Sequence, residues 1–265
     1  MKIRTIALAL GLMTAQLLPA PARAESPLLD VPNFPDFALL GVGRGPRYLG
    51  SDEDTVAVAP AVQLDLGSQY VSLQANYLSI NLMHHGRWQA GPAGILRFGR
   101  RNVDNPQIDA LPDVDMSVDL GGFLAYEFGG PDPRDRWRFN FGALQDVTGA
   151  HGGMVADFGI RRWLPVGRYG AFGLAAAASW GSEDYMDTYF SVSPADALLS
   201  GLPSYSAGPG WRDARAMALF VQPVSREWAV GAGLLYSYLL QDAGSSPVTL
   251  SRDQLYFGIG IARAW

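Results

Sequence analysis

The feature that most constrains this chain is a period-two alternation of large apolar residues with small or polar ones. Residues 255–265 show it clearly, because Phe257, Ile259 and Ile261 are each separated by a glycine or an alanine. Alternation of this kind indicates β-strands rather than helices. The segments that share it are residues 56–66, 78–83, 88–98, 116–128, 137–143, 154–164, 172–180, 215–221, 228–240 and 255–265.

The second face of these strands separates two classes of β protein. In a soluble sandwich that face meets water and is richly polar. Here it consists mostly of glycine and alanine, in a chain with 31 glycines and only 17% charged residues. A transmembrane antiparallel β-barrel fits this pattern, since its outer face contacts lipid, its inner face lines a crowded lumen, and about 9–11 residues suffice for each strand. The charged residues expected to face the lumen are Asp65, Arg97, Asp119, Glu127, Arg138, Asp157 and Arg161.

Aromatic residues support the same fold. All seven tryptophans lie near the ends of the expected strands, as in the aromatic girdles of outer-membrane barrels. The chain ends on Trp265, preceded at alternate positions by Ile261, Ile259 and Phe257, which resembles the signal read by the barrel assembly machinery. We therefore expect that machinery as a partner, and lipid and lipopolysaccharide of the bacterial outer membrane as the surroundings.

The N-terminus is typical of a secretory signal peptide over residues 1–24, with Lys2 and Arg4, an apolar run over residues 6–18, and an Ala-Arg-Ala sequence at 22–24. Residues 25–36 are then expected as a periplasmic segment and residues 37–265 as the barrel. Removal of the signal changes the net charge from −5 to −8, with 17 arginines against 25 acidic residues. This charge argues against nucleic acid as a partner. The absence of cysteine excludes a disulfide framework and a lipid-anchor cysteine.

The number of strands is constrained by parity, because single-chain bacterial barrels have an even number with both termini in the periplasm. The alternation together with a strand beginning near Phe37 gives eleven segments. Dividing residues 70–83 near Ala75 and Asn76 gives twelve strands, with ten as the alternative. This topology places residues 100–113, 145–152, 182–210 and 241–251 outside the cell.

The longest of these loops, residues 182–210, contains a helix signal. Ser193 is a typical N-cap, Pro194 suits the first helical position, Asp196 suits the first turn, and Gly201 suits the end. The sequence therefore predicts a short surface helix there.

Several segments have the character of family motifs: residues 46–51 (PRYLGS), 98–100 (FGR), 151–153 (HGG), 185–190 (YMDTYF), 200–210 (SGLPSYSAGPG) and 242–247 (DAGSSP). They resemble the MipA/OmpV family of outer-membrane proteins. The resemblance spans most of the mature chain and is most specific in residues 179–247. It implies an outer-membrane barrel that acts as a structural scaffold linking a lytic transglycosylase, which is a murein hydrolase, to a murein synthase. It also leaves open a small porin-like channel or an adhesin. This chain departs from the family at Gly152, where a polar or basic residue is common.

The residue pattern does not predict an enzyme, a metal site or a cofactor. His84, His85 and His151 lie outside any nucleophile motif and are expected as surface residues, so a lipid-modifying enzyme is the least favoured class. A glycine-rich stretch at residues 41–45 is not followed by a helix pattern, which argues against a phosphate-binding loop. Acidic clusters at residues 52–54 and at 183, 184 and 187 are expected as solvated loops, or as sites that bridge through divalent cations to lipopolysaccharide phosphates.

Overall fold

The computed structural model describes residues 36–84 and 86–265. The expected signal peptide (1–24) and all of the expected N-terminal segment (25–36) except Asp36 lie outside the described residues, as does His85.

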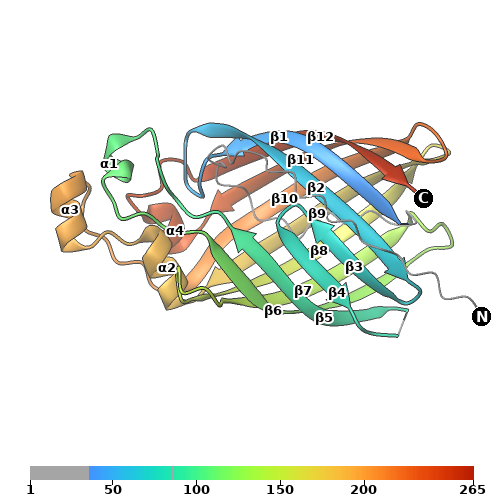
Figure 1. Cartoon of the computed structure of the whole chain (residues 1–265), viewed down its shortest axis with the longest axis horizontal. Coiled ribbons are helices and arrows are strands. Elements are labelled where there is room, and N and C mark those ends of the chain that lie inside the picture. The colour runs from blue at the N-terminus through green and yellow to red at the C-terminus, as the bar shows by residue number, and fades with distance from the viewer. Residues whose placement is uncertain (1–35, 85) are drawn as a thin grey trace, which may run out of the picture.

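Twelve antiparallel strands form a closed barrel, in which strands adjacent in sequence are adjacent in the sheet and β12 pairs with β1 (Figure 1). The prediction of twelve strands is confirmed, and the alternative of ten is wrong. The strands are β1 (Phe37–Pro46), β2 (Asp54–Leu66), β3 (Gln69–Gln74), β4 (Tyr77–Asn81), β5 (Trp88–Arg97), β6 (Ser117–Gly129), β7 (Arg136–Asp146), β8 (Met154–Val166), β9 (Gly170–Gly181), β10 (Gly210–Pro223), β11 (Trp228–Leu239) and β12 (Asp253–Ala264).

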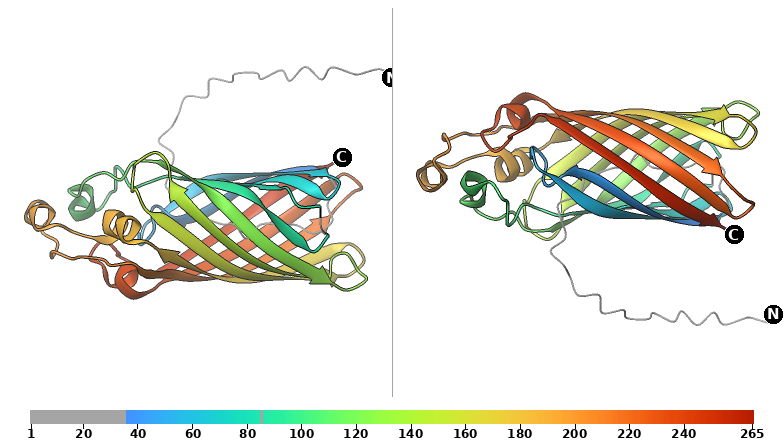
Figure 2. Two further views of the ribbon diagram at one scale, coloured as in Figure 1. Left: turned by 90° about the horizontal axis from the view of Figure 1, so that it is seen from below. Right: turned by 90° about the horizontal axis from the view of Figure 1, so that it is seen from above.

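Four short helices gather at one end of the barrel, which we call the loop end; the opposite end, where the chain terminates, is the turn end (Figures 1 and 2). None of the helices in the described part of the chain is long and apolar enough to cross a membrane. The helix predicted in the longest loop is α3, in which the Ser193 hydroxyl accepts from the Asp196 N–H and Gly201 ends the helix at φ 73°. The helices are α1 (Pro106–Asp109), α2 (Glu183–Phe190), α3 (Pro194–Ser200) and α4 (Gln241–Ser245).

The hairpin of β3 and β4 is much shorter than the rest of the barrel wall. These strands have 6 and 5 residues, whereas the other strands have 10 to 14. Their turn lies at Ala75 and Asn76, as predicted, and Ala75 adopts φ 53°. Strand pairing between β2 and β3 extends only from Ala61 to Leu66. The loop-end half of β2 therefore has β1 as its only strand neighbour among the described residues.

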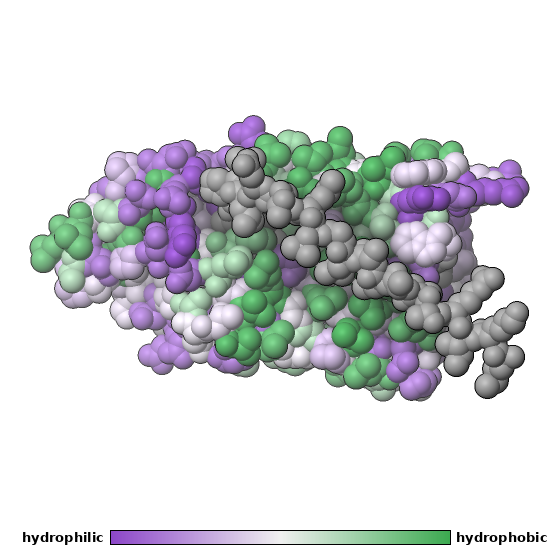
Figure 3. All heavy atoms as spheres, viewed as in Figure 1, coloured by the Kyte–Doolittle hydropathy of each residue, from purple (hydrophilic) through white to green (hydrophobic). Residues whose placement is uncertain are grey.

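Large apolar side chains cover the outside of the strands, and hydrophilic residues gather at the two ends (Figure 3). Trp88, Trp228 and Trp265 are exposed near strand ends, as a girdle requires. Trp163 is different, because it points into the barrel and is only 2% exposed. Its register on β8 places it on the inner face, where it packs in a cluster with Phe37 at the turn end. The girdle interpretation is therefore wrong for Trp163.

Candidate functional site

The loop end is closed by a cap, which we define as residues 182–209 and 240–251. Tyr185, Met186 and Phe190 of α2 are buried against Val155 of β8 and Leu239 of β11. Hydrogen bonds join the parts of the cap to one another and to a neighbouring loop: the Ser246 hydroxyl donates to the Phe190 carbonyl at 2.5 Å, and the Leu250 N–H donates to the Gly50 carbonyl at 2.8 Å. The cap is thus a packed layer across the barrel mouth (Figure 2).

A buried ion pair lies directly beneath the cap. Arg97 is the last residue of β5, and its Nε lies 2.5 Å from Oδ2 of Asp119 on β6. The other carboxylate oxygen of Asp119 accepts from the Ser117 hydroxyl at 2.8 Å and contacts His151 Nε2 at 3.1 Å. The side chains of Arg97, Asp119 and His151 are 3%, 0% and 0% exposed. The carboxylate of Asp119 therefore contacts three buried side chains, those of Arg97, Ser117 and His151.

His151 was expected on the surface, and this expectation is wrong. The loop that carries it folds around Asp146, whose carboxylate accepts backbone N–H bonds from residues 148, 149, 151 and 152. Gly152 adopts φ 63°, a left-handed conformation that favours glycine. This tight loop turns the imidazole inward, which no feature of the local sequence indicates. His84, in contrast, is exposed.

Asp119, Asp146 and His151 each place a possible ligand atom within 4.8 Å of the others, a spacing that could hold a metal ion. The Gly153 N–H donates to His151 Nδ1 at 3.0 Å. Nδ1 must then be the acceptor, so the neutral ring carries its proton on Nε2 and donates to Asp119. A metal would need the Nε2 lone pair. The residues are therefore arranged as a hydrogen-bonded network and do not fit a metal site.

A second buried charge cluster lies across the lumen and depends on a β-bulge. The register between β9 and β10 shifts between Trp211 and Asp213, so that Arg212 and Asp213 are both buried although they are consecutive. Asp213 binds Arg212 Nε at 2.6 Å and Arg215 Nε at 3.0 Å. Arg215 also pairs with Asp157, which accepts from the Ser179 hydroxyl at 2.6 Å.

Tyr185 connects the two clusters to the cap. Its hydroxyl accepts from Arg212 Nη1 at 2.7 Å. The guanidinium carbons of Arg97 and Arg212 each lie 5.3 Å from the centre of its ring, within the range of a cation–π contact. Docking of α2 is thus coupled to both ion-pair clusters, which we name together the charge network.

The other residues predicted to face the lumen lie nearer the turn end. Glu127 pairs with Arg138 at 3.5 Å. Arg161 is buried and lines a cavity of about 40 Å³ together with Asp157. Asp65 is exposed and accepts from the side chain of Gln63 at 3.2 Å. The structure therefore joins Arg97 with Asp119 and Glu127 with Arg138, but leaves Asp65 outside the charge network.

The expected assembly-signal residues, Phe257, Ile259, Ile261 and Trp265, are all exposed on or just beyond β12. The first acidic cluster is partly neutralised, because Asp54 pairs with Arg44 at 3.0 Å and Glu53 lies 3.7 Å from Arg47. The acidic residues of α2, at positions 183, 184 and 187, lie exposed on its outer side. Bridging to lipopolysaccharide by divalent cations stays a prediction.

Sequence reasoning missed Arg212, Asp213, Arg215 and Tyr185. Strict alternation cannot place two consecutive residues inside a barrel, so only the bulge accounts for the burial of both Arg212 and Asp213. The available signal was the adjacent pair of opposite charges at the start of an otherwise apolar strand. For Tyr185 the available signals were the length of its loop and its place in the family-like segment 185–190.

Comparison with protein families matches residues 39–265 to the family described as MltA-interacting protein MipA. No curated protein sequence matches the chain. Among solved structures, NanC porin is similar with a TM-score of 0.46 and 8% identity, covering 86% of this chain and 100% of that chain. OmpT of Vibrio cholerae has a TM-score of 0.39 and 7% identity over 91% and 100% of the two chains. A Pseudomonas aeruginosa FadL homologue has a TM-score of 0.37 and 10% identity over 87% and 90%.

Proposed function

Because the chain belongs to the MltA-interacting protein MipA family and is an outer-membrane β-barrel, we propose that it is a scaffold that holds murein enzymes at the membrane. The partners proposed are a lytic transglycosylase and a murein synthase. The observation that carries the proposal is that packed side chains obstruct the barrel at both ends.

A channel needs a continuous water path, and three features oppose one. The cap packs across the loop end, and the charge network lies directly below it with side chains as little as 0–3% exposed. Two cavities that border the network have volumes of only about 50 and 40 Å³. At the turn end, Trp163 and Phe37 pack inside the barrel. These features support a structural role over a porin-like one.

We place the turn end in the periplasm, where its turns would contact the enzymes. The turn between β6 and β7 is the best candidate, because ion pairs hold its shape. Arg134 pairs with Asp132 at 2.8 Å and donates to the Gly170 carbonyl at 2.9 Å, while Arg162 pairs with Asp135. The pKa of Asp132 is held below its ordinary value by its hydrogen bonds from Arg134. A rigid, charged turn suits recognition of a folded partner.

The proposal is tested by two measurements on the same reconstituted protein. Capture of a purified MltA-type lytic transglycosylase is expected, and planar bilayers are expected to show no discrete openings. Arg134→Ala should weaken capture, whereas Arg226→Ala, in the turn between β10 and β11, should leave it unchanged. Steady openings without capture would support the small porin instead.

An adhesin is the second candidate, and α3 favours it. This helix lies at the far end of the cap, and its Leu198 and Leu199 are 88% and 75% exposed. Exposed apolar side chains at a loop tip are suited to partner contact. Replacing both with aspartate should reduce adherence of cells without changing capture of the transglycosylase.

We also infer that the protein is not a lipid-modifying enzyme. Support comes from His151, since its Nδ1 accepts from Gly153 and its Nε2 contacts Asp119. Neither nitrogen is available to activate a nucleophile in this arrangement. Lipase or acyltransferase activity that is lost in His151→Ala would contradict the inference.

A further inference from the structure

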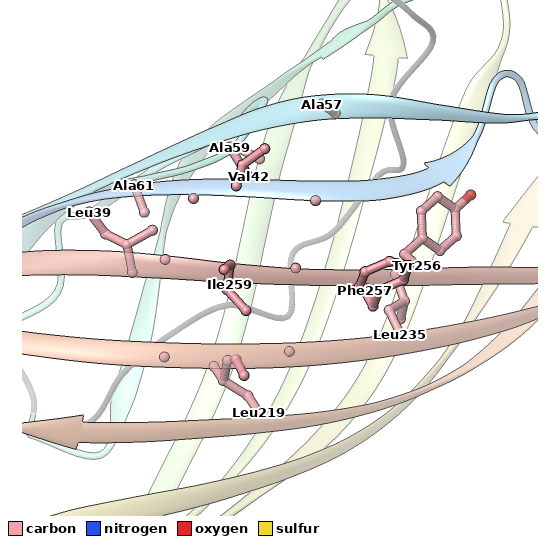
Figure 4. A pocket seen from close by; sticks show the side chains of 18 of the residues that line it. Leu39, Val42, Ala57, Ala59, Ala61, Leu219, Leu235, Tyr256, Phe257 and Ile259 are labelled. Atoms are coloured by element: carbon pink, nitrogen blue, oxygen red, sulfur yellow. The ribbon is translucent and has the colours of Figure 1, made fainter.

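A third cavity, of about 230 Å³, lies inside the barrel on the wall formed by β1, β2, β10, β11 and β12 (Figure 4). Of the described residues that line it, only Arg44, Thr55 and Tyr256 have polar side chains, and Arg44 is directed to Asp54. Leu39, Leu219 and Leu235 border the space (Figure 4). The wall is therefore apolar at the level of the cavity, whereas the ion pairs of β10 lie at its loop end, before Met217.

Glycines remove the side chains from the middle of this wall. They form two rows across three adjacent strands, because each glycine of β12 pairs with one glycine of β1 and one of β11. The rows are Gly41–Gly260–Gly231 and Gly43–Gly258–Gly233. The result is a smooth strip of backbone facing the cavity.

Close strand packing explains four of these glycines but leaves two unexplained. A Cβ at Gly43 would lie 2.6 Å from the Phe257 carbonyl, and Cβ atoms at positions 231, 258 and 260 would meet backbone atoms at 3.1–3.2 Å. At Gly41 and Gly233 the nearest atoms would lie at 3.4 Å, an ordinary contact, and neither residue has a positive φ. Glycine weakens a strand and marks places where another molecule approaches closely. At these two positions the missing side chain leaves space for a ligand.

The cavity also reaches the interruption in the barrel wall. Ala75, in the turn between β3 and β4, lines it together with Ala57 and Ala59 of β2. On the loop-end side of this turn, residues 54–59 of β2 pair only with β1 among the described residues. Three strand spacings of about 4.8 Å separate β2 from β5 at this hairpin. We call this interruption the notch.

Backbone on the free edge of β2 needs polar partners. Alternate N–H and C=O groups of residues 54–59 point away from β1, as in any antiparallel strand. Such groups cannot remain unsatisfied in hydrocarbon. A molecule at the notch must therefore combine an apolar part for the cavity with a polar part for this edge.

We propose that the cavity holds one acyl chain of a lipid from the surrounding membrane, which enters through the notch while its polar head meets the free edge of β2. The volume fits part of one chain, since it exceeds the apolar cavity of about 150 Å³ that holds benzene and falls below the 300–1,000 Å³ of typical pockets for drug-sized ligands. The site does not depend on the scaffold function, because its lining lies within the barrel.

The test uses the full mature chain in phosphatidylethanolamine nanodiscs that contain a phosphatidylethanolamine with a diazirine in one acyl chain. After illumination, mass spectrometry maps the labelled residues. We expect labels on inward-facing Met217 and Leu219 in addition to outward-facing Leu255 and Ile261. Labels confined to outward-facing residues of the wild-type protein would overturn the proposal without any variant.

Two matched variants locate the chain. Gly233→Leu fills the cavity, and Ala216→Leu adds the same side chain to the outer face of β10, outside the cavity lining. In Gly233→Leu, labelling of the inner residues should fall about tenfold, which corresponds to about 1.4 kcal/mol of binding free energy. Ala216→Leu should leave it unchanged. Heat-modifiable mobility on gels checks that each variant folds. Unchanged labelling of the inner residues in folded Gly233→Leu would overturn the proposal. A second comparison uses a variant that lacks residues 25–35. Inner labelling that is seen in this variant but not in the full mature chain would also overturn the proposal.

Discussion

Replacing Asp119 with alanine should strongly destabilise the barrel, because Asp119 is the common acceptor of three buried partners. Arg97 Nε, the Ser117 hydroxyl and His151 Nε2 lie at 2.5, 2.8 and 3.1 Å from its carboxylate. Without it, the guanidinium of Arg97 loses the carboxylate that lies 2.5 Å from its Nε, although its side chain is only 3% exposed. Breaking a buried pair in this way costs about 3–5 kcal/mol. The total stability of a protein is about 5–15 kcal/mol, so the loss should be large.

The assay is urea unfolding of the protein in lipid vesicles, followed by tryptophan fluorescence and by heat-modifiable mobility. The free energy of unfolding is obtained by linear extrapolation. A double variant, Arg97→Met with Asp119→Leu, removes both charges and should be more stable than Asp119→Ala. Asp52→Ala serves as the control, because Asp52 is an exposed acid and its replacement should change stability by no more than about 0.5 kcal/mol.

Two results would refute the reasoning. One is a loss of less than about 1 kcal/mol in Asp119→Ala, which would mean that water reaches Arg97 and that the network is not buried in solution. The other is a double variant no more stable than the single variant, which would mean that packing, rather than an isolated charge, causes the loss.

Three further predictions concern the cap, the turn end and the His151 cluster. Burial raises the pKa of Tyr48 and Tyr189 above the ordinary value of 10.0, so the pKa of each is higher in the folded than in the unfolded protein. The contribution of these two residues to the stability of the folded state is therefore full below about pH 10 and declines as the pH rises further. Protease cleavage within residues 182–210 should therefore increase above pH 10, and unchanged cleavage would contradict this. Trp163→Ala should cost about 3–5 kcal/mol in the urea assay by emptying the cluster at the turn end, and a loss near zero would show that this cluster does not pack. EDTA should leave the unfolding midpoint unchanged in vesicles free of lipopolysaccharide, because both nitrogens of His151 have protein partners; a lower midpoint would indicate a bound metal.

Much of the fold could be predicted from the sequence, because strand formation depends on a repeat that is visible locally. Alternation located the strands, and parity divided the hairpin at Ala75 and Asn76, where the structure has its turn. The helix α3 was predictable for the same reason, since the capping contact of Ser193 with Asp196 spans three residues. Signals within a few residues of one another are sufficient for such elements.

The candidate site was predictable only in part. Arg97 and Asp119 were assigned to the lumen by alternation, but their pairing depends on the register between β5 and β6. The bulge before Asp213 breaks the alternation, so Arg212 was not found. Trp163 followed the alternation, but its position near a strand end suggested a lipid-facing girdle rather than the inner face that its register gives it.

By itself, the sequence determined the class of fold and the chemical character of each face, because both follow from a period of two residues along the chain. The number of strands needed a further argument, the even count of a closed barrel, which favoured twelve over ten. Only the tertiary structure decided that His151 is buried against Asp119, that the lumen is charged beneath the cap and lined by glycine along β1, β12 and β11, and that a short hairpin interrupts the barrel wall. These features depend on which distant residues meet once the barrel closes. Strand pairing and the packing of the cap determine these contacts, and neither produces a periodic pattern in the sequence.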